Sequence, residues 1–272
     1  KSPSKKKKKE GKKERRRKEG EKKEGRREKE KERRKKERKK KEGRKKGRRE
    51  AGKEKKRRKK ERWKKEMKKG RKGRKMTIKK VLKYGTPSLR QPSKEVHKVS
   101  KKIKDLVKDL LETMYAQNGV GLAAPQIGEN YRIFVIDVSS GDEPLNPMVF
   151  INPKIIKKSG AFISSEGCLS FPEVFTEVRR YKNVTIKAQD SKGRSFVLNA
   201  DGGTLLTRAI QHEYDHLDGI LFIDHARDID DANEKLSKYN LPAVEEDRLI
   251  NEDKLEEEIQ KNQTKDKEEN ND

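Results

Sequence analysis

The feature that most constrains the fold of this chain is an abrupt change in composition after residue 75. Residues 1–75 hold 47 Lys and Arg residues against 14 Asp and Glu residues, a net charge of +33. Residues 76–272 hold 29 basic and 33 acidic residues, a net charge of −4. The first segment has so few apolar side chains that it cannot bury enough surface to offset the entropy lost on ordering. We therefore expect a disordered tract over 1–75 and a folded domain after it.

Three interpretations fit the basic tract. It can be an electrostatic arm that contacts ribosomal RNA or another polyanion, or a solvated tail without a partner. It can also be foreign to the natural protein, because purine-only codons encode Lys, Arg, Glu and Gly, and a purine-rich stretch upstream of a gene would translate in this way. Met76 opens the more ordinary sequence, and we favour it as the working start.

The compartment is indicated by what the sequence lacks. Cys168 is the single cysteine, so an intrachain disulfide is impossible and a reducing compartment is expected. No apolar run approaches the roughly 18 residues that cross a bilayer, and the charged N-terminus has no apolar segment of a secretory signal. We expect a bacterial-type cytoplasmic protein, with an organelle as the alternative, and no contact with a membrane.

Two helices are predicted after residue 76. Apolar residues at helical spacing indicate one from about Ser100 to Gln117, with Ser100 as its N-cap and Gly119 just past its end. The other is expected from about Gly203 to Leu217.

Strands are predicted between these helices. A buried strand is expected over Tyr131–Val138, and 150–153 and 155–156 suggest a further strand pair. Segments 184–188 and 196–198 flank an Asp-Ser-Lys-Gly turn and predict a hairpin. A helix, a run of strands and a second helix together predict the α+β class.

The second helix carries the sequence His-Glu-x-x-His. Residues four apart lie on one face of a helix, so His212 and His216 can direct two imidazoles at a single metal ion. Glu213 lies next to one ligand and can take a proton from a water bound to the ion. The motif also occurs by chance in solvated helices, so a helix with an exposed pair of histidines is the alternative.

A catalytic metal site with an open position needs a third protein ligand. Cys168 can supply it from a Glu-Gly-Cys-Leu-Ser stretch, with His97 and His225 as rivals on residue type alone. A lone cysteine is more often a small buried hydrophobe. Upstream, a Gly-rich stretch ends near Gln126, whose side-chain amide can donate to a developing oxyanion, although a structural turn is the favoured explanation of that stretch taken alone.

Three stretches taken together resemble the peptide deformylase family. The family is marked by Gly-x-Gly-Leu-Ala-Ala-x-Gln, Glu-Gly-Cys-Leu-Ser and Gln-His-Glu-x-x-His-Leu-x-Gly, in that order. They stand here as Gly119–Gln126, Glu166–Ser170 and Gln211–Gly219, and the resemblance covers about 76–225. It implies antiparallel or mixed sheets packed around a central metal-binding helix. The catalytic domain is then expected over 76–240, followed by a polar, disordered tail over 241–272.

The resemblance implies an activity and roles for the matching residues. The enzyme would be a metal-dependent hydrolase that removes the formyl group from the N-terminal formyl-methionine of new polypeptides, with hydroxide attacking the formyl carbon. Family membership implies ferrous iron, with zinc or nickel as alternatives. It also implies a monomer that meets formyl-Met nascent peptides and, transiently, the ribosome. The residues implied are Cys168, His212 and His216 as metal ligands, Glu213 as general acid/base, Gln126 and the Leu169 backbone N–H as oxyanion donors, and Gly119, Gly121 and Leu122 as substrate contacts.

One position departs from the family pattern. Many relatives carry a basic residue seven positions after the cysteine, and Phe175 stands there in this chain, with Arg179 and Arg180 close by. How the peptide docks on that side is therefore left open.

Two other functions fit parts of the sequence. A zinc protease of the longer His-Glu-x-x-His pattern would need a third histidine at position 222, which is Phe222, so only a downstream carboxylate such as Glu234 could replace it. A basic RNA- or ribosome-binding protein that carries an inactive metal fold is the alternative from another class, and the intact ligands and base argue against it.

Overall fold

The computed structural model describes residues 77–140 and 143–250, together with Glu50, Glu54, Arg57, Arg58, Glu61–Trp63 and Lys65. Lys56–Asp272 forms one compact unit and Lys1–Lys55 another. The described part of Lys56–Asp272 is a mixed α+β fold built on one antiparallel sheet, as predicted. The proposed start at Met76 and most of the two expected disordered tracts lie outside the described residues.

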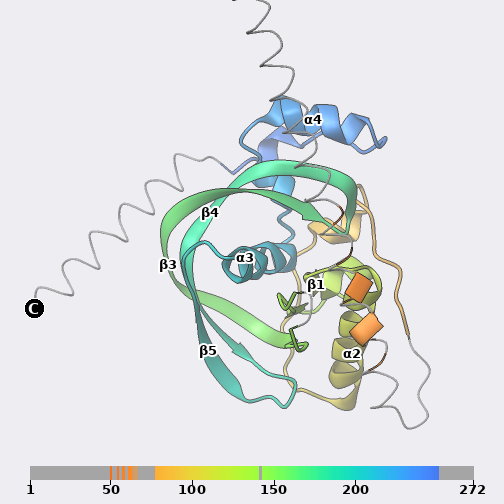
Figure 1. Ribbon diagram of the computed structural model, residues 1–272, viewed down its shortest axis with the longest axis vertical. Coiled ribbons are helices and arrows are strands. Elements are labelled where there is room, and N and C mark those ends of the chain that lie inside the picture. Colours follow the sequence, from red (N-terminus) through yellow and green to blue (C-terminus); the bar gives the residue numbers. More distant parts are fainter. Residues whose placement is uncertain are drawn as a thin grey trace, which may run out of the picture. The chain divides into compact units, whose positions relative to one another are not determined.

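The sheet has five strands in the same order as the sequence, and every neighbouring pair is antiparallel. The two long strands, β3 and β4, curve around helix α3, and α2 lies beside β1 (Figure 1). The strands are β1 Gly121–Ala123, β2 Ile133–Ile136, β3 Met148–Cys168, β4 Phe171–Gln189 and β5 Ser195–Ala200.

The expected strand at Tyr131–Val138 and the hairpin of 184–188 and 196–198 are confirmed as β2 and the β4–β5 pair. The expected pair of strands at 150–156 is wrong, because these residues belong to one continuous strand, β3. The pairing of β3 with β4 shifts register between Ile151 and Lys154, where Asn152 has a φ of 49°. Pro153 cannot donate to a strand ladder, so the break in pattern marks a bulge within a strand instead of its end.

Helix α2 spans Lys101–Ala116, close to its predicted bounds. The Ser100 side chain accepts a hydrogen bond from the Ile103 N–H, which satisfies one of the free donors of the first turn. The helix ends where Asn118 takes a φ of 58° and the Gly119 N–H donates to the Met114 carbonyl over 2.9 Å.

Helix α3 spans Leu205–Leu217 and is capped by Thr204, whose side chain accepts from the Thr207 N–H. Gly219, just beyond its C-cap Asp218, has a φ of 72°. A Cβ there would lie 2.4 Å from the Arg90 carbonyl oxygen, so only glycine fits this turn. The segment Pro87–Arg90 that approaches it is a 3-10 helix.

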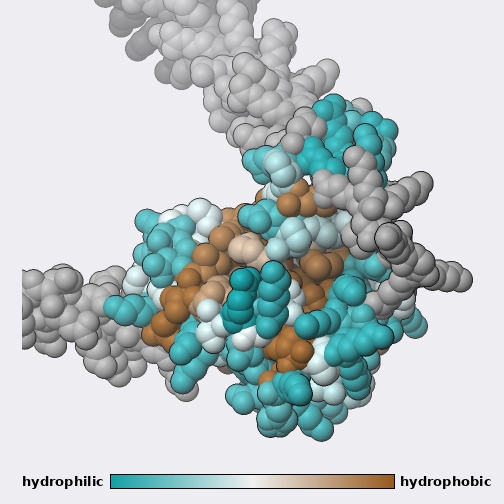
Figure 2. Space-filling view, turned by 90° about the horizontal axis from the view of Figure 1, so that it is seen from below, coloured by the Kyte–Doolittle hydropathy of each residue, from teal (hydrophilic) through white to brown (hydrophobic). Residues whose placement is uncertain are grey.

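Buried apolar side chains form three clusters, and the second fixes α3 in the curve of the sheet. Phe134 and Phe150 of the sheet stack at 4.6 Å and belong with Ile210 and Leu217 of α3. Burying several such side chains at about 1.5–3 kcal/mol each outweighs any single hydrogen bond in holding the helix in place. On the surface, hydrophobic residues gather near the middle of one face, between hydrophilic ones (Figure 2).

Trp63 is an exception within the tract that composition predicts to be disordered. Its side chain is only 2% exposed and its ring stacks on Tyr115 of α2 with 5.7 Å between centroids. Trp63 therefore belongs to the first cluster, with the buried face of α2.

The packed part of the chain extends further toward the C-terminus than predicted. The third cluster includes Phe171, Val178 and Phe222. Helix α4, Ile229–Ser237, adds its buried residues Ala232 and Leu236 to this cluster. Val244 is 7% exposed and Leu249 packs on the same cluster, so the predicted boundary at residue 240 falls inside a packed segment. Across the described residues, no helix is both long and apolar enough to span a membrane.

Candidate metal centre

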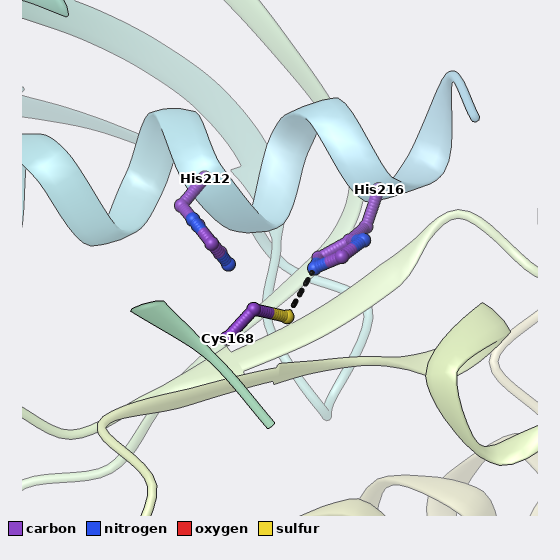
Figure 3. A group of neighbouring side chains, drawn as sticks. All are labelled: Cys168, His212 and His216. Atoms are coloured by element: carbon purple, nitrogen blue, oxygen red, sulfur yellow. Dashed lines mark hydrogen bonds between the residues drawn. The ribbon is translucent and has the colours of Figure 1, made fainter. Parts of the chain in front are cut away.

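Three side chains that are distant in sequence converge beside α3. Both histidines project from α3 toward Cys168, which ends β3 (Figure 3). The ligand atoms of Cys168, His212 and His216 all lie within 4.8 Å of one another, and Cys168 Sγ is 3.3 Å from His216 Nε2. One sulfur and two imidazole nitrogens are a donor set that suits a transition metal and leaves a coordination position free. The group could therefore hold a metal ion.

The charge state of Cys168 favours this use. Burial alone would raise the pKa of the thiol, but His216 and His212 more than offset burial, and the pKa lies well below its usual value. The sulfur is therefore poised as a thiolate, the form that binds metals.

His212 is held in place by a charged network that sequence reasoning missed. Its Nδ1 lies 2.9 Å from a carboxylate oxygen of Glu166, which leaves Nε2 for the metal side. Arg180 donates two 3.0 Å hydrogen bonds to the same carboxylate. Burial raises the pKa of Glu166, but Arg180 and His212 more than reverse this and lower it to about 2.

The network continues to the other side of Arg180. Its guanidinium also donates to the Asp215 carboxylate. The same carboxylate lies 3.0 Å from His225 Nε2. The Arg180 side chain is 3% exposed, so this cation is buried between two carboxylates. Arg180 is buried on the same face of β4 as Thr176 and Val178. A charged residue at a position where alternate residues are buried is the sequence signal that could have revealed this network.

Glu213 lies beside the same three side chains in a different environment. It is buried, and within the described part of the chain its Oε2 is among the buried polar atoms without a hydrogen-bond partner. Burial raises its pKa to about 7, although His212 and His216 act in the opposite direction. A carboxyl group with a pKa near neutrality and an unused oxygen is suited to moving a proton.

Gly121 makes room for that carboxylate. A Cβ at Gly121 would lie 2.3 Å from Glu213 Oε1, so a side chain there would displace that carboxylate. Gly119 is similarly close to Leu169, with 2.9 Å from its constructed Cβ to Leu169 Cδ1. Leu122 is fully buried in the first cluster.

Gln126 directs its amide at the cysteine. Its Oε1 accepts from the Ala123 N–H over 2.8 Å, and this contact fixes which end of the amide is the donor. Its Nε2 lies 3.3 Å from both Cys168 Sγ and Ser170 Oγ. A preorganised N–H donor therefore stands at the centre, on the side of β3 where Leu169 follows the cysteine.

The rival ligands lie elsewhere. His97 is exposed on a loop, and His225 pairs with Asp215. Glu234 is exposed on α4 and binds Lys238 Nζ at 2.6 Å. Arg180 is buried and paired with Glu166 and Asp215, so it cannot serve as an exposed cation that binds the peptide.

Comparisons with known proteins identify a single family. The family model for polypeptide deformylase matches residues 78–232. The peptide deformylase of Dictyoglomus thermophilum is 48% identical over 149 residues, which are 55% of this chain and 93% of that protein. Peptide deformylase 1 of Clostridium perfringens is 52% identical over 137 residues, 50% of this chain and 90% of that protein.

Solved structures give the same result. A peptide deformylase from Synechococcus elongatus in complex with actinonin matches with a TM-score of 0.57 and 39% identity, over 63% of this chain and 91% of that one. The peptide deformylase from Thermotoga maritima matches with a TM-score of 0.51 and 39% identity, over 56% and 99% of the two chains. From its sequence motifs, its fold and these likenesses, this chain belongs to the peptide deformylase family.

Proposed function

We propose that this protein removes the formyl group from the N-terminal formyl-methionine of newly made polypeptides, at a metal held by Cys168, His212 and His216. The observation that carries the proposal is the convergence of those three ligand atoms within 4.8 Å of one another, next to a buried Glu213 carboxylate oxygen without a partner. A divalent ion bound there would lower the pKa of a water molecule and polarise the formyl carbonyl group.

Different residues then carry proton transfer, stabilisation of the developing charge and contact with the substrate. Glu213 takes the proton of the attacking water and delivers it to the departing amine nitrogen, a transfer for which a pKa of about 7 is well matched. The Gln126 amide and the Leu169 backbone N–H donate to the oxygen on which charge develops. Gly121 keeps the carboxylate of Glu213 unobstructed. Gly119 and Gly121 are proposed to border the bound peptide, whereas the fully buried Leu122 would support them from the core.

The experiment that tests this is release of formate from formyl-Met-Ala-Ser by the full chain purified without oxygen. We expect formate release that a chelator abolishes. A protein that carries metal and releases no formate would contradict the proposal.

For the ion, we propose ferrous iron, with zinc or nickel as substitutes. A thiolate and two imidazoles accept all three, so availability decides which ion binds. The thiolate also predicts sensitivity to oxidation, with loss of the ion. Metal analysis of anaerobically purified protein, repeated after exposure to air, tests both points: iron that is present at first and lost in air supports them.

For the setting, we propose a cytoplasmic monomer that meets nascent peptides at the ribosome and whose catalytic domain begins at about residue 76 and includes the packed segment after residue 240. The net charge of +33 over 1–75 supports polyanion binding through that tract. Binding of polyuridylate RNA by the full chain, and by a chain that starts at Met76, tests the arm. Equal affinities would remove it from the proposal, and mass spectrometry of the native protein shows whether residues 5–70 are made at all.

A further inference from the structure

One edge of β3 is open next to the metal ligands. β2 pairs with β3 only over Met148–Ile151, whereas β4 pairs with it as far as Cys168. Among the strand pairings of residues 77–140 and 143–250, none uses the far edge of β3 at Gly167. An extended peptide can add to such an edge through its main chain.

Side-chain alternation along β3 separates two faces at this point. Glu166 and Cys168 both point toward α3, where they meet His212 and His216. Gly167, between them, faces the opposite side. A peptide paired along this edge therefore alternates in the same way: one side chain points toward the metal centre and the next points to the outer face.

Phe175 occupies the outer face directly beside Gly167. The two residues are paired across β3 and β4, and a Cβ built on Gly167 would lie 2.4 Å from Phe175 Cε1. The aromatic ring therefore lies over the glycine, in the space that a side chain would fill. Phe175 is nevertheless 54% exposed, so much of its ring is open to contact.

A row of three positions across the sheet results. A peptide residue opposite Gly167 places its side chain on the same face as Phe175, and Gly167 itself has no side chain to separate them. If the methionine points toward the metal centre, the residue that follows it is the one that meets the ring. Glu177, two residues along β4 on the same face, is already paired with Arg227 at 3.8 Å. The cost to an acidic side chain on this surface therefore comes from the loss of its hydration beside the aromatic ring.

On the proposed function, we propose that Phe175 is a specificity-determining residue that selects formyl-methionyl peptides with an apolar or aromatic second residue. Aromatic and apolar pairs of this kind are worth about 2- to 10-fold in kcat/KM. The interaction is remote from the reacting atoms, so we expect the preference to appear mainly in KM.

The test compares kcat/KM for formyl-Met-X-Ser, with X as Phe, Leu, Ala or Asp, in the metal-loaded full chain. We expect the wild type to favour Phe and Leu over Ala by about 2- to 10-fold, and Ala over Asp. Phe175→Ala should remove the preference for Phe over Ala, whereas the rate on X = Ala should stay within about twofold. Phe175→Tyr should keep the preference, and Phe175→Arg should raise the relative rate on X = Asp.

Ile163→Ala is the matched control, because Ile163 is 48% exposed on β3, the strand of Gly167, but is paired with Arg179, well away from Gly167. It should leave the order of substrates unchanged. A wild type indifferent to X, a Phe175→Ala variant that keeps the preference, or an Ile163→Ala variant that loses it would each overturn the inference. Absence of formate release from every peptide would instead overturn the proposed function.

Discussion

The two histidines of α3 are one turn apart and chemically equivalent in sequence, yet their surroundings differ. On the His212 side, Glu166 and Arg180 form a closed, buried network that fixes the ring. On the other side, His216 Nδ1 and Glu213 Oε2 are both buried atoms without a hydrogen-bond partner in the described part of the chain. The charged partners on one side therefore fix the orientation of His212, whereas the other side leaves a carboxylate oxygen of Glu213 available to exchange a proton.

The largest expected effect lies on the open side. Glu213→Gln removes the proton carrier but keeps the size and shape of the side chain, so kcat should fall by about 10²- to 10⁴-fold while the metal-to-protein ratio is unchanged. Glu234→Gln, at an exposed carboxylate, should change neither quantity. A Glu213→Gln variant with normal kcat would show that the unpartnered oxygen has no catalytic use.

Gln126→Met comes next. It removes the amide that faces Cys168 and should cost about 10²- to 10³-fold in kcat, as for the loss of one oxyanion donor. Stopped-flow or steady-state formate release measures this, and a circular dichroism melt checks the contact to the Ala123 N–H that the variant also loses. A change confined to KM would assign Gln126 to substrate binding.

The closed side should respond through the metal instead of through the chemical step. Glu166→Gln weakens the hold on His212 and leaves Arg180 with less opposing charge, so metal affinity should fall by about 10- to 100-fold. With saturating metal, kcat should largely recover. Competition with a chelator gives the affinity; a variant whose kcat stays low at saturating metal would erase the division between the two sides.

The smallest effect is that of pH. Because the pKa of Glu213 is raised to about 7 and the base form is needed, activity should increase as pH rises through 7. The deprotonated fraction changes by about 10-fold between pH 6 and pH 8. A kcat/KM profile measures this, and the same profile for Glu213→Gln should lose that rise; a rise that persists would belong to another group.

Local patterns predicted much of this fold and some of its centre. The cap at Ser100 and the His-Glu-x-x-His spacing are short-range features, so α2 and α3 were predicted close to their bounds. The continuity of β3 was missed because Pro153 is a local stop signal that pairing with β4 overrides. Arg180 and Asp215 were missed because their partners come together only when β4 curves around α3.

Composition also has a limit as a guide. It predicts disorder for a tract of charged residues and glycine, but a single aromatic side chain can dock on a folded neighbour, as Trp63 does on Tyr115. Likewise, the polar composition after residue 240 predicts a disordered tail, but the Val244 side chain is buried in the third cluster.

The most direct test of the central claim is the metal-to-protein ratio of Cys168→Ala, purified without oxygen beside the wild type and His97→Ala. His97 is an exposed histidine and a rival ligand on residue type alone. We expect about one ion per chain for the wild type and for His97→Ala, and little or none for Cys168→Ala. A Cys168→Ala variant that holds metal as fully as the wild type would contradict the convergence of sulfur and imidazole on one ion.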